Sequence, residues 1–151
     1  MSVKSNALGV IVEDILSQLR TPSVLQLATQ GVRVFGDDLE TPMVLLANQD
    51  NQGGPMTNMN GEELLSTAYL NILAVVEAGD LELATQIDDA IRPQILRTAN
   101  YSVRQNTKGK VYSITLAGNR SYVGPGKNGL GMYLYHGGYY RVRAEGRELT
   151  V

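Results

Sequence analysis

The sequence has no cysteine and no tryptophan, and it has a single histidine, His136. Without cysteine the chain forms no disulfide and offers no thiolate to a metal ion. With one histidine, a Ser–His–Asp triad or a histidine-rich metal site would depend on that side chain alone. Long apolar runs are also missing, since no stretch approaches the roughly 20 residues that a membrane helix needs. These absences argue against a disulfide scaffold, a zinc module and a membrane span.

The chain has 151 residues, of which 43% are hydrophobic. This length suits one domain with a self-sufficient core. Lys4 is the only early basic residue, and Glu13 and Asp14 lie in the first apolar segment. The apolar region of a secretory signal would not carry two acidic residues. We therefore expect no signal peptide and no membrane partner.

The net charge of −2 conceals an uneven distribution. Residues 1–100 hold five Lys/Arg and thirteen Asp/Glu, a net charge of −8. Residues 101–151 hold eight Lys/Arg and two Asp/Glu, a net charge of +6. Such asymmetry favours a nucleic-acid-binding face or association of one copy with the next. Alternatively, the two halves fold together and neutralise each other.

Residues 1–47 are predicted to form a helix followed by short strands. The Thr21-Pro22 step ends the helix. Residues 24–29 and 32–35 have strand composition and flank Gly31, so a hairpin is expected, and residues 42–47 form a third strand. Over residues 5–19, apolar side chains recur at spacings of three and four, as on one face of a helix: Leu8, Ile11, Val12, Ile15 and Leu19.

Residues 48–61 form a long polar stretch centred on Gly53-Gly54-Pro55. Loops of this length without secondary structure are uncommon in compact domains and are usually functional or disordered. We expect an arm that orders against a partner. A simple mobile insertion is the alternative.

Residues 62–98 are predicted to form a helical pair at the centre of the domain. Asn60 and Glu63 have the spacing of a capping box, and the apolar residues that follow cover most of a helix circumference. Gly79 fits the left-handed residue that ends a helix, and Asp80 can cap a second helix with one apolar stripe. Pro93 is expected to end or kink that second helix.

Residues 101–151 are predicted to form an antiparallel β-meander with strands over 110–116, 120–123, 131–136 and 139–144. Turn signals separate these strands at Asn119, at Asn128-Gly129 and at Gly137-Gly138. Residues 149–151 have the composition of a further edge strand. The fold class is therefore α+β, with an N-terminal helix and a central helical pair packed on an antiparallel sheet.

No motif for catalysis or cofactor binding stands out. Residues 124–129, Gly-Pro-Gly-Lys-Asn-Gly, resemble a phosphate loop, but position 121 is Ser121 where a Walker loop has glycine, and Asn128 replaces the Ser or Thr after the lysine. His136 is expected to be a hydrogen-bonded turn residue. We expect no cofactor, no metal ion and no enzymatic activity.

Carboxylates could still act in pairs, and Asp37-Asp38-Glu40 and Asp88-Asp89 are the candidates. A hydrolase that uses two acids needs them to face each other across a cleft. Asp37-Asp38 suits turn chemistry, and Asp88-Asp89 suits the solvated face of a helix. An enzyme with an unrecognised carboxylate site stays as an alternative.

Basic residues alternate with tyrosines through the C-terminal third. In residues 139–144, strand geometry places Tyr140 and Val142 on one face and Tyr139, Arg141 and Arg143 on the other. Such a surface can bind single-stranded nucleic acid, and Tyr and Arg are also enriched at protein interfaces. Because a nucleic-acid-binding domain is typically basic and this chain is not, protein partners are favoured. The basic residues are Arg104, Lys108, Lys110, Arg120, Lys127, Arg141, Arg143 and Arg147.

The chain resembles small virion proteins of tailed bacteriophages, of the head–tail connector, tail-completion or capsid-decoration type. The resemblance rests on the absence of cysteine and tryptophan, the Gln/Asn/Gly-rich stretch 48–61 and the Tyr/Gly-rich end at 124–140. It implies a structural subunit that contacts copies of itself or other virion proteins, located in the virion or in the host cytoplasm before assembly. The contact residues it implies are Gln52, Gly53, Gly54, Pro55, Met56, Lys110, Arg120, Tyr139, Arg141 and Arg143.

Overall fold

A computed structural model describes residues 2–4, 7–34, 39–48, 56–57, 63–96, 104–106, 109–126, 129, 131–146 and 148–150. Three helices and nine strands lie in this part of the chain. In chain order they are β1 (Ser2–Lys4), α1 (Ala7–Leu19), α2 (Pro22–Leu25), β2 (Val32–Val34), β3 (Met43–Asn48), β4 (Met56–Thr57), β5 (Glu63–Glu77), α3 (Leu81–Ile95), β6 (Arg104–Asn106), β7 (Gly109–Pro125), β8 (Met132–Gly146) and β9 (Glu148–Thr150).

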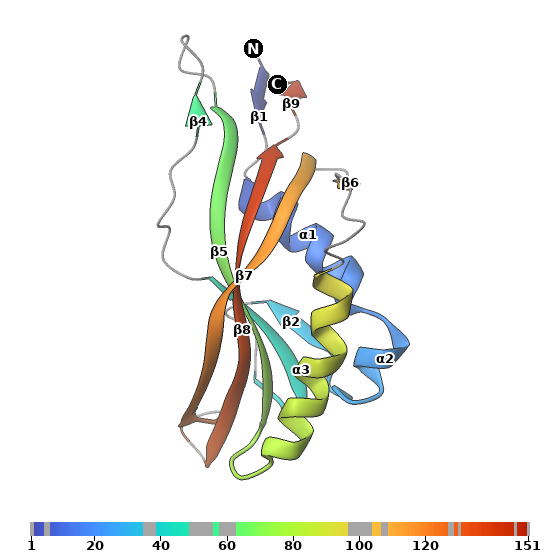
Figure 1. Ribbon diagram of the computed structural model, residues 1–151, viewed down its shortest axis with the longest axis vertical. Helices are drawn as coiled ribbons and strands as arrows, with labels where there is room; N and C mark the ends of the chain where they lie inside the picture. Colours follow the sequence, from blue (N-terminus) through green and yellow to red (C-terminus); the bar gives the residue numbers. More distant parts are fainter. Residues whose placement is uncertain are drawn as a thin grey trace.

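The main sheet has the strand order β2-β3-β5-β8-β7-β6, and β4 pairs with the start of β5. Neighbouring strands are antiparallel except for β2 and β3, which are parallel. The two chain ends form a separate ribbon of β1 and β9. Both α1 and α3 lie on the same side of β5 and β8 (Figure 1). The predicted fold class, α+β with helices packed on a sheet, is confirmed.

Most of the core lies between the sheet and the helices. Side chains of α1 and α3 meet the facing side chains of the central strands, and Ile15, Leu19, Ile87 and Ile91 are fully buried there. A smaller cluster on the opposite face contains Met43, Leu73, Val75 and Tyr135. No helix in the described part of the chain is long and apolar enough to cross a membrane.

Both amphipathic helices follow from their sequence patterns. The helix predicted over residues 5–19 is α1. The cap predicted at Asp80 is confirmed, because the Leu83 backbone N–H donates to Asp80 Oδ1 at 3.3 Å. Pro93 lies inside the last turn of α3, and the helix ends two residues later at Ile95.

The predicted central helical pair is wrong in its first half, because residues 63–77 form the strand β5. Every side chain from Leu70 to Val76 is buried, since the strand lies in mid-sheet with apolar clusters on both faces. A strand buried on both faces has a nearly continuous apolar run, and periodicity alone does not distinguish such a run from a buried helix. Gly79 does take positive φ, 95°, but it follows a strand.

The hairpin predicted around Gly31 is also wrong. Residues 22–25 form the short helix α2, with Pro22 in its first turn, where a missing N–H costs nothing. Gly31 has a φ of 88°, yet the strand after it, β2, runs parallel to β3. The strands predicted at 32–35 and 42–47 are confirmed as β2 and β3.

The C-terminal third is one long hairpin, β7 and β8, where four shorter strands were predicted. The turn expected at residues 128–129 joins β7 to β8, and Gly129 has a φ of 73°. Gly137 and Gly138 lie within β8 and form no turn. A Cβ on Gly137 would collide with the Ile72 carbonyl oxygen, so glycine here permits close approach of β5 and β8. Asn119 likewise lies within β7, and the predicted last edge strand is β9, paired with β1.

Candidate interaction surface

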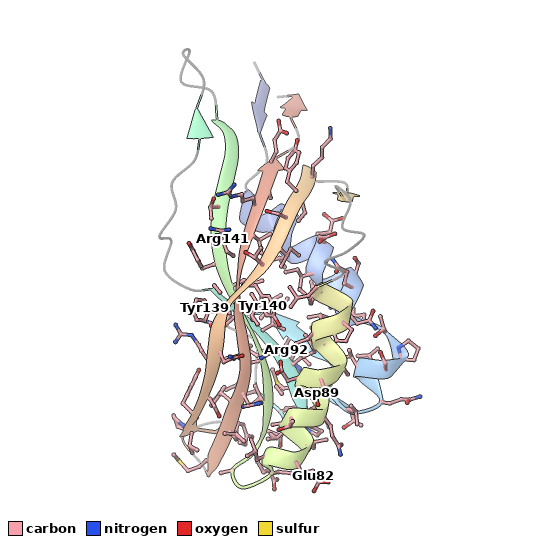
Figure 2. The ribbon with its side chains drawn as sticks, viewed as in Figure 1. Glu82, Asp89, Arg92, Tyr139, Tyr140 and Arg141 are labelled. Atoms are coloured by element: carbon pink, nitrogen blue, oxygen red, sulfur yellow. The ribbon has the colours of Figure 1, made fainter. Side chains whose placement is uncertain are left out.

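The two faces of β8 carry different chemistry. Tyr140, Val142 and Ala144 are buried on the side of the helices. Arg143 is exposed, and Tyr139 and Arg141 are partly exposed, on the other side. Figure 2 shows Tyr140 on the α3 side of β8, and Tyr139 and Arg141 on the side away from it. The alternation predicted for residues 139–144 is confirmed. We call the face that α1 and α3 leave uncovered the open face; it carries Lys110, Arg120, Tyr139, Arg141 and Arg143.

Arg141 and Arg143 are the centre of the open face. Arg141 lies between Tyr69 of β5 and Thr115 of β7, and Arg143 lies between Thr67 and Ser113. Hydroxyl-bearing neighbours leave the positive charges uncompensated, and neither arginine has an ion-pair partner in the described part of the chain. Two residues along a strand span about 7 Å, so the two guanidinium groups form one compact basic patch.

Arg120 and Tyr139 are stacked over a glycine. The aromatic ring of Tyr139 lies directly over Gly118, its cross-strand partner, so a Cβ at that position would meet the ring. The guanidinium carbon of Arg120 lies 5.1 Å from the centroid of the Tyr139 ring. This geometry is a cation–π contact, and it leans Arg120 inward over β8.

The tyrosine pair Tyr122 and Tyr135 continues the open face toward the β7–β8 turn. Their rings are stacked, with centroids 4.9 Å apart and planes 9° apart. The Tyr135 hydroxyl donates to the Pro125 carbonyl oxygen at 3.1 Å, and burial raises the pKa of Tyr135. Tyr135 is therefore fixed, while Tyr122 is 48% exposed.

Glu145 is an acidic residue of this face, and Glu77, opposite Tyr133 at the end of β5, is another. The Tyr112 hydroxyl donates to Glu145 Oε2 at 2.6 Å, and this hydrogen bond to the carboxylate raises the pKa of Tyr112. Lys110, which is exposed, lies opposite Glu145 in the β7–β8 ladder. The carboxylate thus lies at the end of the face near Lys110, away from Arg120.

Five of the predicted contact residues share the open face: Lys110, Arg120, Tyr139, Arg141 and Arg143. The predicted arm does not join them in the described part of the chain. Gln52, Gly53, Gly54 and Pro55 lie outside the described residues, and Met56 begins β4, opposite Leu65 of β5. The Tyr122–Tyr135 stack was not predicted, although the two residues are equally distant along the chain from the Asn128-Gly129 turn, and a hairpin about that turn pairs them.

The helix side of the molecule is acidic. Asp80, Glu82 and Asp89 are exposed on α3 (Figure 2 labels Glu82 and Asp89). Basic residues therefore concentrate on the open face, and acidic residues are exposed on the helix that covers the other face.

A polar bridge joins α3 to β7 beneath this acidic surface. Arg92 Nε lies 2.8 Å from Asp88 Oδ2, and Arg92 Nη2 donates to Asn119 Oδ1 at 2.6 Å. Asp88, only 5% exposed, is thus used in helix–sheet packing. Burial, and the nearby Asp88 carboxylate, raise the pKa of Tyr140 to about 12. Asp89, the other half of the candidate acid pair, faces solvent.

The remaining candidates for chemistry are separated from one another. His136 Nδ1 lies 3.1 Å from Ser121 Oγ on the neighbouring strand, which confirms the predicted hydrogen bond. The predicted turn position is wrong, because His136 lies within β8. Glu40 pairs with Arg33 at 3.5 Å, and Asp37 and Asp38 lie outside the described residues. Within the described ranges no three acidic or histidine residues gather as metal ligands would. These placements provide no basis for a catalytic proposal.

Comparison with known proteins shows a likeness to a solved structure. No protein-family model matches the sequence, and no curated protein matches it. Among solved structures, a chain of the "Virion of native gene transfer agent (GTA) particle" has a similar structure, with a TM-score of 0.60 and 14% sequence identity. The match covers 93% of this chain and 98% of that one. At this identity the likeness shows a shared fold, and the shared fold belongs to a component of a virion.

Proposed function

We propose that this protein is a non-enzymatic structural subunit of a phage-like particle, and that its open face is a contact surface. The likeness to a gene transfer agent virion chain over almost the whole length of both chains supports a virion role. The head–tail connector, tail-completion and capsid-decoration roles all require a small domain that contacts neighbouring subunits. The finer proposal is that this chain fills one of those roles.

The observation that carries the proposal is the separation of charge across the sheet. Arg141 and Arg143 lie on the open face without acidic partners in the described part of the chain, and Glu82 and Asp89 lie exposed on α3. When copies associate face to back, the basic patch of one meets the acidic helix of the next. Such a head-to-tail contact repeats, so it closes into a ring or extends into a filament.

Charge reversal tests this contact directly. A variant with Arg141→Glu and Arg143→Glu should lose the face-to-back association, and so should a variant with Glu82→Arg and Asp89→Arg. Mixing the two variants should restore association, because each altered surface then meets an opposite charge on the other variant. Native mass measured at low salt provides the readout.

Arg20→Glu is the matched control. Arg20 is exposed beyond the end of α1, and its reversal changes the net charge as much as a single reversal at Arg143 does. The control should associate like the unaltered chain. Equal loss in Arg20→Glu and Arg143→Glu, or no restoration in the mixture of double variants, would contradict the face-to-back contact.

The arm at residues 48–61 is proposed as a second contact. Deleting residues 52–55 shortens it and retains β4, which pairs with β5. We expect the deletion to weaken assembly with partners while the folding transition stays unchanged. A deletion variant that assembles as well as the unaltered chain would remove the arm from the proposal.

A nucleic-acid-binding role is the second candidate, and the alignment of Arg141 and Arg143 with tyrosines on one face favours it. Binding through this face would fall steeply as salt rises, because each neutralised phosphate releases counterions. Single-stranded and double-stranded DNA titrated at several salt concentrations measure this effect. The residue 52–55 deletion separates the two functions, since it should impair assembly and leave DNA binding intact.

A further inference from the structure

The second half of β7 forms an open edge of the main sheet. Its inner edge pairs with β8 from Gly118 to Pro125, but its outer edge pairs with β6 only at Gly109, Lys110 and Val111. Beyond Val111, no described strand continues the sheet. In Figure 1 the lower half of β7 is the outermost ribbon on its side of the sheet. The backbone N–H and C=O groups along this edge are therefore available to another strand.

Apolar side chains gather along this edge. Six large hydrophobic side chains are exposed in the described part of the chain, and four of them belong to β7 or to the facing end of β8. Tyr122 is 48% exposed and Val123 is 53% exposed, while Leu25 and Leu81 lie elsewhere. Edge strands that face water usually carry charged side chains, bulges or proline. An apolar edge is typical of a strand that pairs with a partner.

Residues 118–124 lack the features that usually prevent an edge strand from pairing with another strand. The two bulges of β7 come earlier, between Val111 and Ser113 and between Leu116 and Gly118. Arg120 is the charged residue in this stretch, and it lies over the Tyr139 ring, inward from the edge. Its Nε atom is buried without a hydrogen-bond partner, so the side chain is not extended into solvent.

We infer that this edge pairs with β7 of a second copy, antiparallel and centred on Tyr122. The length of the edge supports this partner. The other free edge of the main sheet, β2, has three residues, whereas β7 of a second copy offers an edge as long as the one it would pair with. Centring on Tyr122 places Arg120 opposite the partner's Gly124, which leaves room for its guanidinium. Centring on Arg120 would place two like charges directly opposite, which is unfavourable.

The proposed register also continues the aromatic stack. Tyr122 of each copy already stacks on its own Tyr135. With the two Tyr122 residues opposite each other, four tyrosine rings form one row across the dimer. Cross-strand aromatic pairs are favourable, and hydrogen bonds between the two backbones fix the relative orientation of the strands. This contact does not depend on the face-to-back contact, because it involves the edge of the sheet and few charges.

Cysteine cross-linking tests the register. Because the chain has no native cysteine, each single-cysteine variant can form a disulfide only through the introduced residue. Directly opposed residues in an antiparallel pair have Cα atoms about 5 Å apart, within disulfide range. Tyr122→Cys should therefore form a disulfide-linked dimer under mild oxidation. Val123→Cys is the matched control: its Cα would lie about 8 Å from its own counterpart, beyond disulfide range, given the strand rise per residue. A mixture of Ser121→Cys and Val123→Cys should cross-link again.

Native mass keeps the inference testable without oxidation. Tyr122→Arg should weaken dimerisation about tenfold or more, since it removes an aromatic pair and sets two like charges opposite each other. Leu25→Arg, an equivalent change on α2, should have no effect. Equal cross-linking of Tyr122→Cys and Val123→Cys, cross-linking of neither, or a Tyr122→Arg variant that dimerises like the unaltered chain would overturn the inference. A dimer that persists when salt abolishes larger assemblies would separate this contact from the face-to-back contact.

Discussion

The helix side and the open face of the sheet are built from alternate residues of the same strands, yet they have different physical roles. On the helix side, Leu70 and Tyr140 are fully buried. On the open face, Arg141 and Arg143 contact hydroxyl-bearing neighbours and solvent. Because successive strand residues point to opposite faces, neighbouring positions can be selected for different properties. From Tyr139 to Ala144, β8 thus buries its even positions in the core and leaves its odd positions at least partly exposed.

The largest expected difference between the two faces is the loss of stability when a side chain is truncated to alanine. Leu70→Ala removes a fully buried side chain and should lower the free energy of unfolding by about 2–5 kcal/mol. Arg141→Ala, on the open face of the neighbouring strand, should change it by about 0.5 kcal/mol or less. Urea denaturation of both variants checks this. A loss above about 2 kcal/mol in Arg141→Ala would mean that the open face contributes to folding.

Substitution of two glycines by alanine tests how rigid the surroundings are at two places in the β7–β8 hairpin. The new Cβ would meet backbone atoms at one position and a side chain at the other. At Gly137 a Cβ meets the backbone of β5, which cannot move alone, so Gly137→Ala should cost about 3 kcal/mol. At Gly118 it meets the outer atoms of the Tyr139 ring, which can rotate away, so Gly118→Ala should cost about 1 kcal/mol or less. Thermal and urea unfolding of the two variants provide the test. Equal costs would show that Tyr139 is as immobile as the backbone.

The Tyr140 hydroxyl gives the helix side a pH dependence. The pKa of this hydroxyl is raised from 10.0 to about 12 in the folded protein. Below pH 10 the hydroxyl is therefore neutral in both the folded and the unfolded chain, and its ionisation costs no stability. Between pH 10 and 12 the unfolded chain ionises first, and on the order of 2 kcal/mol is lost.

Tyr140→Phe removes this loss and also removes a buried hydroxyl that lacks a hydrogen-bond partner. The variant should therefore be at least as stable as the unaltered chain at pH 8, and its advantage should be larger at pH 11. Urea unfolding at both pH values measures the difference. Parallel pH profiles for the two proteins would contradict the raised pKa.

Helices α1 and α3 and the two faces of β8 over residues 139–144 were predictable because each has one dominant local signal. In α3 the signal is the cap at Asp80 with a single apolar stripe, and in β8 it is the alternation from Tyr139 to Ala144. Local signals failed where tertiary contacts decide the structure. The apolar run of β5 has both faces covered, so it lost the alternation that marks a half-buried strand. Gly137 has the composition of a turn, but it allows close packing of β8 on β5.

The open edge of β7 could not be derived from sequence, because strand order determines which strand lies at an edge. The antiparallel hairpin with β8 was indicated by Asn128-Gly129, but the placement of β5 on the other side of β8 was not. The contact surface is therefore predictable in its chemistry and not in its boundary. Lys110, Arg120 and Arg141 were identified from residue type, and the position of Tyr122 at the open edge only from the structure.

Native mass as a function of salt tests the central claim, that the open face mediates assembly, most directly. The unaltered chain should form assemblies larger than a dimer at low salt, and these should dissociate as salt screens the contact between the basic patch and α3. Arg141→Glu with Arg143→Glu should abolish them at every salt concentration. Assemblies of the same size at low and moderate salt in both proteins, or a strict monomer of the unaltered chain under all conditions, would contradict the account.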